Sequence, residues 1–232
     1  MGGVHQYIVA ACAIVLALAA PSLAGDPDML QDICVADLSL MSRFPSMYRD
    51  PLLYIAAIKL NGFPCKANVT ADDFVSANLR NPGNTNNPNG ATVTAANVEN
   101  FPGVNTLGVS MARIDYAPGG LNPPHTHPRA TEIIFVLEGT LEVGFLTTDN
   151  KLFSKIINKG DVFVFPARLV HFQQNRGHGP AAVIAAFNSQ LQGTQAIAMT
   201  LFGANPPVSP DILAKAFRID HGLVHAIKAR FP

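Results

Sequence analysis

The chain has 232 residues, with 16 basic and 16 acidic side chains and no run of lysine or arginine. Such a balance, without a basic patch, excludes nucleic acid and an anionic membrane surface as expected partners. The length suits one domain with a sizeable core.

The N-terminus has the pattern of a secretory signal. Residues 8–20 are almost wholly apolar, the small residues Ser22 and Ala24 follow at the spacing of a cleavage site, and the chain turns polar from Gly25-Asp26. The apolar run is too short to span a bilayer, so we expect a signal peptide over residues 1–24, cleaved after Ala24. No lysine or arginine precedes the run, which leaves an N-terminal anchor as the alternative. No other segment predicts a membrane span.

Cysteine usage and one sequon agree with export. Once Cys12 has left with the signal, Cys34 and Cys65 remain. In an oxidising compartment an even pair predicts a disulfide, with two unpaired buried thiols as the alternative. Asn68 begins an Asn-Val-Thr sequon and is a predicted N-glycosylation site on an exposed turn.

The mature chain divides into three parts. Residues 25–105 form an N-terminal extension, irregular over 25–70, with a helical pattern over 47–59, a short helix at 71–74 and a long loop over 81–90. Residues 106–190 form a β-barrel core with Gly and Asn turns between short strands. The expected strands are 107–116, 132–137, 140–146, 152–157, 161–165, 170–174 and 182–187. Residues 191–232 form a final barrel segment and two amphipathic helices, 211–219 and 221–231.

Three histidines and one glutamate are the candidate metal ligands. His125 and His127 are two residues apart, and in an extended strand such residues point to the same face. Glu132 follows after a bend, and His171 comes later in the chain. Imidazole and carboxylate donors suit manganese, iron, nickel or zinc. Octahedral geometry would leave two positions open, whereas tetrahedral zinc would be filled by the protein. The alternative is a set of buried, hydrogen-bonded side chains.

The flanks of these ligands form two spaced motifs. In the first, Gly119 is followed by His125-Thr-His127, Glu132 and Gly139; in the second, Gly160 is followed by Pro166, His171 and Asn175. This doubled motif resembles the cupin superfamily, and within it the chain is similar to plant germin-like proteins. Further stretches at 28–38, 61–65, 106–110 and 201–203 carry the same resemblance across nearly all of the mature chain.

The resemblance implies an all-β fold, a cupin jelly-roll barrel of six or more strands with an irregular N-terminal segment and a C-terminal α-helical extension. It implies manganese bound by His125, His127, Glu132 and His171, and a Cys34–Cys65 disulfide. It also implies secretion to the apoplast or cell wall, and a homo-oligomer, commonly a hexamer built as a trimer of dimers.

Three positions depart from the family pattern. Two asparagines are credited with holding oxalate in oxalate-oxidising germins; the matching positions here are Ala112, which has no hydrogen-bond donor, and Asn122, our candidate substrate contact. Arg168 stands where the second motif normally has glycine, so a positive φ there would be strained. We expect it to be a solvated turn residue, with a guanidinium that attracts anions to the metal port as the alternative. Residues 40–58 are an insertion between the two cysteines.

The remaining polar residues are assigned no chemistry. His178 lies in a Gly-rich turn, and His221 and His225 lack a third ligand. Glu138 and Glu142 are expected to be strand-end or solvent-facing charges, and residues 159–161 a simple turn.

Three functions follow. The leading one is a secreted manganese glycoprotein of plant defence that dismutates superoxide to hydrogen peroxide at the metal site, without separate catalytic residues. The second is a non-enzymatic apoplastic binding, structural or receptor-like protein whose metal is structural. The third is oxalate oxidase, which Ala112 disfavours because a lost hydrogen bond to a charged group costs about 1.5–3 kcal/mol, or one to two decades in binding.

Overall fold

The computed structural model describes residues 32–39, 59–60 and 63–231. The expected signal at 1–24, the insertion at 40–58 and nearly all of the helical pattern at 47–59 therefore lie outside the described residues. Lys59, at the end of that pattern, belongs instead to a short strand, β1 (Lys59–Leu60), which pairs with β2 (Phe63–Pro64).

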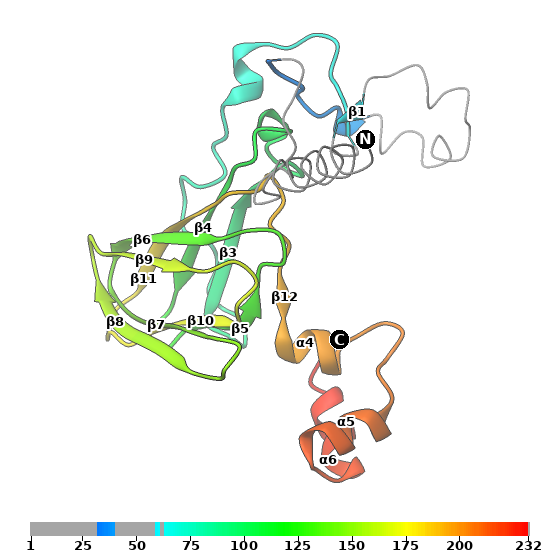
Figure 1. Ribbon diagram of the computed structural model, residues 1–232. Coiled ribbons are helices and arrows are strands. Elements are labelled where there is room, and N and C mark those ends of the chain that lie inside the picture. Colours follow the sequence, from blue (N-terminus) through cyan, green and yellow to red (C-terminus); the bar gives the residue numbers. More distant parts are fainter. Residues whose placement is uncertain (1–31, 40–58, 61–62, 232) are drawn as a thin grey trace, which may run out of the picture.

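Two five-stranded antiparallel sheets face each other and form the barrel (Figure 1). The first has the strand order β12-β5-β10-β7-β8. Its strands are β5 (Leu121–Thr126), β7 (Thr140–Leu146), β8 (Leu152–Asn158), β10 (His171–Asn175) and β12 (Gln195–Ala196). The second has the order β3-β4-β11-β6-β9. Its strands are β3 (Ala91–Ala96), β4 (Ser110–Tyr116), β6 (Glu132–Glu138), β9 (Val162–Phe165) and β11 (Ala181–Phe187). The all-β jelly-roll architecture expected from the sequence is confirmed.

The seven expected strands are all present, with ends that differ by up to three residues. Three strands of the two barrel sheets were missed. β5 contains Pro123 and Pro124, and prolines usually argue against a strand because they cannot donate to the ladder. β3 lies upstream of residue 106, yet it pairs with β4 along six residues, so the second sheet begins at Ala91. β12 has only two residues.

The core fills the space between the sheets. Alternate residues of the strands point inward, and their side chains form one cluster: Ala112, Ile114, Tyr116, Ala130, Ile134, Val136, Leu141, Val143, Ile157, Phe165, Ala181, Val183, Ala185 and Phe187. Gly139 forms the turn between β6 and β7 at φ 82°, where a side chain would collide with Ala181. The polar ligand candidates line the same interior, towards one end of this cluster.

The predicted disulfide joins two parts of the N-terminal extension to each other. Cys34 and Cys65 are bonded, so the alternative of two unpaired thiols is wrong. Asn105 donates from Nδ2 to the Cys34 carbonyl at 2.9 Å. The expected short helix is η2 (Ala71–Phe74), a 3-10 turn, and a second turn, η3 (Pro102–Val104), precedes β4. Residues 81–90 contain no helix or strand, as expected.

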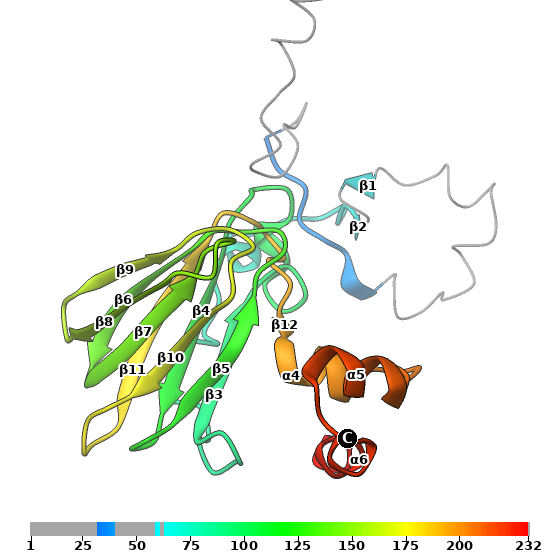
Figure 2. The same cartoon turned by 60° about the horizontal axis from the view of Figure 1, so that its bottom comes forward.

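The C-terminal arm is helical and projects from one side of the barrel (Figure 2). It consists of α4 (Ile197–Phe202), which was not predicted, α5 (Pro210–Phe217) and α6 (His221–Lys228). Ser209 and Asp220 cap α5 and α6, as these residue types favour. The arm has a small core of its own, formed by Phe202, Leu213, Ala214 and Val224. None of the described helices is long and apolar enough to cross a membrane.

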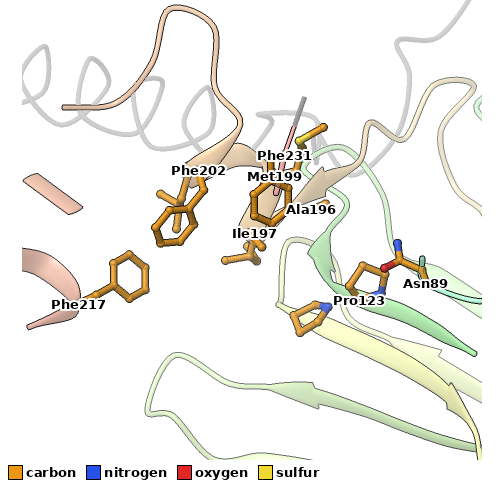
Figure 3. Close-up of a pocket in the computed structure, with 11 residues that line it drawn as sticks. Asn89, Pro123, Ala196, Ile197, Met199, Phe202, Phe217 and Phe231 are labelled. Atoms are coloured by element: carbon orange, nitrogen blue, oxygen red, sulfur yellow. The ribbon is translucent and has the colours of Figure 1, made fainter. Parts of the chain in front are cut away.

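A cavity of about 580 Å³ lies between the arm and the rim of the barrel (Figure 3). The barrel contributes Asn89, Pro123 and Pro124, and the arm contributes apolar side chains that include Phe202 and Phe217. None of the described residues that line it is charged.

Candidate metal centre

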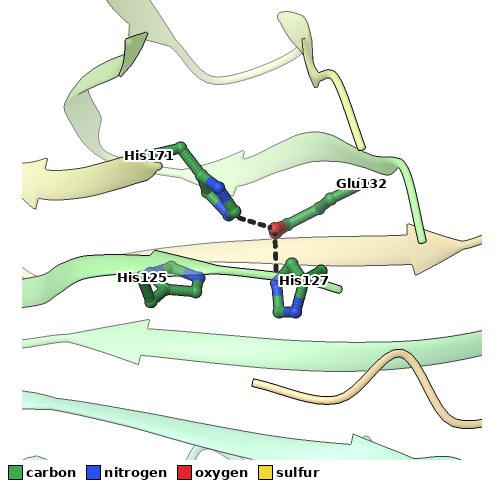
Figure 4. A group of neighbouring side chains, drawn as sticks. All are labelled: His125, His127, Glu132 and His171. Carbon is green, nitrogen blue, oxygen red and sulfur yellow. Dashed lines mark hydrogen bonds and ion pairs between the residues drawn. The ribbon is translucent and has the colours of Figure 1, made fainter. Parts of the chain in front are cut away.

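The four predicted ligands meet inside the barrel (Figure 4). One ligand atom from each of His125, His127, Glu132 and His171 lies within 4.8 Å of the others. All four side chains are buried, with at most 5% of any residue exposed. Among the described residues this is the only group of three or more histidine, cysteine, aspartate or glutamate side chains so placed.

Strand pairing explains why residues distant in sequence converge. His125 lies on β5 and is the register partner of His171 on β10, so their rings stand side by side with centroids 4.1 Å apart. His127 follows directly after β5 on the same face, and Glu132 begins β6 in the opposite sheet. The centre therefore bridges the two sheets.

Backbone carbonyls fix the orientation of each imidazole. The Nδ1 of His125 donates to the Pro123 carbonyl at 2.7 Å, that of His127 to Gly193 at 2.7 Å, and that of His171 to Leu169 at 2.9 Å. A carbonyl can only accept, so Nδ1 carries the proton and Nε2 presents a lone pair to the centre. Aromatic rings add packing, with Phe165 stacked on His171 and Phe187 edge-on to His127.

The arrangement is suited to a cation. The Nε2 atoms of His127 and His171 each lie 3.0 Å from Oε2 of Glu132. With Nδ1 protonated, neutral rings would direct lone pairs at a carboxylate oxygen, which is repulsive unless a proton or a metal ion lies among them. Three imidazoles and one carboxylate are donors that first-row transition metals accept, so the residues present fit such an ion.

Protonation also favours binding. Burial, with the neighbouring His171 adding to it, lowers the pKa of His125 to about 4. Burial alone would raise the pKa of Glu132, but in the metal-free barrel hydrogen bonds from His127 and His171, which require a proton on Nε2, outweigh burial and lower that pKa to about 2. At neutral pH His125 is therefore neutral and Glu132 ionised, the forms that a metal requires.

Residues around the centre include one that the sequence analysis overlooked. Gln173, on β10 two residues beyond His171, is fully buried and donates from Nε2 to Oε1 of Glu132 at 3.4 Å. Its spacing of two from a ligand on a strand was the available signal. Asn122 donates to Oε1 of Gln173 at 2.7 Å. Ala112 is fully buried in the core, and its methyl group offers no hydrogen bond.

Arg168 has φ 68°, so the left-handed conformation expected at this position is present on a non-glycine residue. Its backbone N–H donates to the His127 carbonyl at 3.3 Å and its Nε to the Pro128 carbonyl at 3.1 Å. The side chain thus holds the loop that follows the first histidine pair. Whether it also attracts anions to the metal stays a prediction.

The other polar residues stand apart from the centre. Glu142 accepts from Arg176 at 2.7 Å on the barrel exterior, and Glu138 is exposed at the end of β6. His221 lies 3.2 Å from Asp211 on the arm, and His178 and His225 are exposed. Residues 159–161 form a turn.

Comparison with known proteins agrees with this geometry. Residues 77–225 match the Cupin family. The chain is 73% identical to germin-like protein 1-1 of Oryza sativa subsp. japonica over all of both chains, and 62% identical to germin-like protein subfamily 2 member 1 of Arabidopsis thaliana over 90% of each. A solved structure of oxalate oxidase with the substrate analogue glycolate superposes with a TM-score of 0.78 at 45% identity, covering 88% of this chain and 97% of the other. The chain belongs to the germin-like proteins of the cupin family.

Proposed function

We propose that the protein is a secreted manganese metalloprotein that dismutates superoxide. The observation that carries the proposal is the buried set of three imidazoles and one carboxylate, whose ligand atoms converge within 4.8 Å. Manganese bound there would supply one-electron redox chemistry. His125, His127, Glu132 and His171 would hold it and tune its potential.

Dismutation needs little beyond such a site. Two superoxide anions and two protons yield one hydrogen peroxide and one dioxygen, so the substrate makes no demand for groups that orient a larger molecule. The backbone carbonyls that hold the imidazoles keep the donor atoms in place through the reaction. Buried aromatic side chains pack against the centre and keep bulk water from it, Phe165 against His171 and Phe187 against His127.

The test is superoxide dismutation by the secreted protein after manganese loading, with His125→Ala as the inactive variant. His178→Ala is the matched control, because His178 is exposed and outside the centre. Dismutation by the wild type and the control, and its loss in His125→Ala, would support the proposal. Equal inactivity of all three, with manganese confirmed in the wild type, would contradict it and favour a non-enzymatic binding protein with a structural metal.

Oxalate oxidation is the second candidate, since a solved oxalate oxidase is 45% identical to this chain. Ala112 counts against it. Superoxide dismutation loses nothing by an alanine there, whereas a dicarboxylate would lose about 1.5–3 kcal/mol with each missing hydrogen bond to a charged group. A direct oxalate assay beside an Ala112→Asn variant decides it: a marked rise in the variant would identify this position as the limiting one.

Export and glycosylation are part of the proposal. A signal over residues 1–24 would deliver the chain to the apoplast or cell wall, where peroxide production suits a role in defence. The Cys34–Cys65 disulfide is consistent with an oxidising compartment. Asn68 is exposed in a bend, which suits a glycan. Mass analysis of the secreted protein tests both the cleavage after Ala24 and the glycan.

We also propose a homo-oligomer, commonly a hexamer in this family. The outer face of the second sheet supports it, because side chains that share this face are apolar and partly exposed: Met111, Ile133, Phe135, Val162 and Val164. Contiguous apolar patches on a protein surface mark interaction sites. Light scattering of the secreted protein measures the assembly, and a monomer would contradict it.

A further inference from the structure

Gln173 is the one fully buried amide side chain beside the candidate metal centre within the described chain. It lies on β10, two residues from His171, and its exposed fraction is 0%. Burying an amide without partners is costly, so its hydrogen bonds must be accounted for. The pattern of these hydrogen bonds assigns Gln173 a role that neither the two ligand motifs nor the family comparison indicated.

Two donors fix the amide oxygen. Oε1 of Gln173 accepts from Nδ2 of Asn122 at 2.7 Å and from the hydroxyl of Tyr116 at 3.1 Å. The opposite assignment of the amide would set its NH₂ against the NH₂ of Asn122 and its oxygen against the Glu132 carboxylate. The network therefore has one favourable orientation, with the NH₂ group directed at Glu132.

The two oxygens of Glu132 are thereby given different environments. Oε2 faces Nε2 of both His127 and His171 at 3.0 Å. Oε1 accepts from Nε2 of Gln173 at 3.4 Å. Only one carboxylate oxygen is left directed at the centre.

We propose that Gln173 is a positioning residue that keeps Glu132 a one-oxygen ligand, with Asn122 and Tyr116 holding Gln173 in place. The inference rests on the metal centre of the proposed function and deepens it. A carboxylate bound through both oxygens would occupy a second coordination position, so this hydrogen bond keeps that position open for a small anion. Asn122, expected to contact substrate, acts here through Gln173.

The test uses Gln173→Met, which is close in length but cannot donate. Gln174→Met is the matched control, because Gln174 neighbours it on the same strand and points to the other face. Cobalt(II) serves as the probe, through its affinity by competition with a chelator and the positions of its visible absorption bands. Asn122→Ala leaves Gln173 in the chain but removes one of the two hydrogen bonds that its amide oxygen accepts. This variant decides the question if Gln173→Met does not fold.

We expect Gln173→Met to bind cobalt about 10–100-fold more weakly than the wild type, as changes to groups behind a ligand do, with shifted absorption bands. Asn122→Ala should shift the bands in the same direction by less, and Gln174→Met should match the wild type. Wild-type affinity and spectrum in both Gln173→Met and Asn122→Ala would overturn the role. A wild type that binds no cobalt would overturn it together with the metal centre. A wild type that binds cobalt but, loaded with manganese, does not dismutate superoxide would contradict the proposed activity alone.

Discussion

The centre of the barrel and the C-terminal arm differ in how fully a single chain buries their side chains. In the barrel the polar groups of the candidate centre are at most 5% exposed, and no buried side-chain nitrogen or oxygen of the described residues lacks a hydrogen-bond partner. On the arm Ile212, Phe217 and Leu223 are 61%, 47% and 45% exposed, and a cavity separates the arm from the barrel rim.

This difference separates the candidate metal centre from the C-terminal arm. The candidate centre is complete within one chain, because each imidazole is held by a carbonyl of the same barrel. The arm packs mainly on itself, through a core that contains Leu213 and Val224. Changes at the centre should therefore alter metal binding, whereas changes in the arm should alter local stability and leave the centre intact.

The largest effect is expected from Glu132→Gln, which removes the only carboxylate at the centre. Metal affinity should fall by more than about 100-fold, because even groups behind the ligands contribute ~10–100-fold. Equilibrium competition with a chelator measures it. Glu142→Gln is the control, since Glu142 pairs with Arg176 on the exterior. Unchanged affinity in Glu132→Gln would show that this carboxylate is not a ligand.

In the arm, Leu213→Ala should destabilise the helices without affecting the metal. Leu213 is 1% exposed, and truncating a buried leucine typically costs about 2–5 kcal/mol. Urea unfolding followed by circular dichroism measures the loss, and Ile212→Ala, at an exposed neighbour, should stay within about 0.5 kcal/mol. A parallel loss of metal affinity in Leu213→Ala would break the separation of arm and centre.

Acid should destabilise the metal-free barrel over two successive pH ranges, one for His125 and one for Glu132. The pKa of His125 is lowered to about 4 in the folded chain, against an ordinary 6.5, so the folded state binds fewer protons than the unfolded state between these values. Stability is therefore lost as pH falls from 6.5 to 4, by on the order of 2–3 kcal/mol. The lowered pKa of Glu132 extends the loss from 4.5 towards 2.

Urea unfolding of chelator-treated protein across pH 7 to 4 measures this loss, and His125→Gln should reduce it. A metal-free barrel equally stable at pH 7 and pH 4 would show that burial does not keep His125 neutral.

The smallest effect concerns Arg168. Its left-handed backbone disfavours any residue with a Cβ by roughly 1–2 kcal/mol, so Arg168→Gly should be more stable than Arg168→Ala by about 1 kcal/mol. The two variants lose the same bond from Nε to the Pro128 carbonyl, which makes them a matched pair. Thermal unfolding compares them, and equal stabilities would show that the conformation is not strained.

The sequence predicted the centre better than the strands that build it. A His-X-His pair with matching flanks is specific, so all four ligand candidates were found. The strand that carries His125 was missed, because Pro123 and Pro124 hide its pattern. The prolines are tolerated because neither has a register partner in β10 or β12, and the register of β5 against β10 shifts at this point. Tertiary contacts, absent from local sequence, decide such segments.

The hydrogen-bond partners of the candidate ligands and of Gln173 could not be predicted from the sequence either. Gly193 accepts from His127 across 66 residues, and Tyr116 reaches Gln173 across 57. No local spacing encodes such contacts. The arm was predicted in part: α5 and α6 follow amphipathic patterns, whereas α4 is six residues long and passed unnoticed.

The most direct test of the central claim is a crystal structure of the secreted protein produced with manganese, with anomalous differences measured at the manganese absorption edge. We predict one peak per chain, bonded to Nε2 of His125, His127 and His171 and to Oε2 of Glu132. A manganese-supplied crystal with these four side chains hydrogen-bonded to one another and no peak among them would contradict the account.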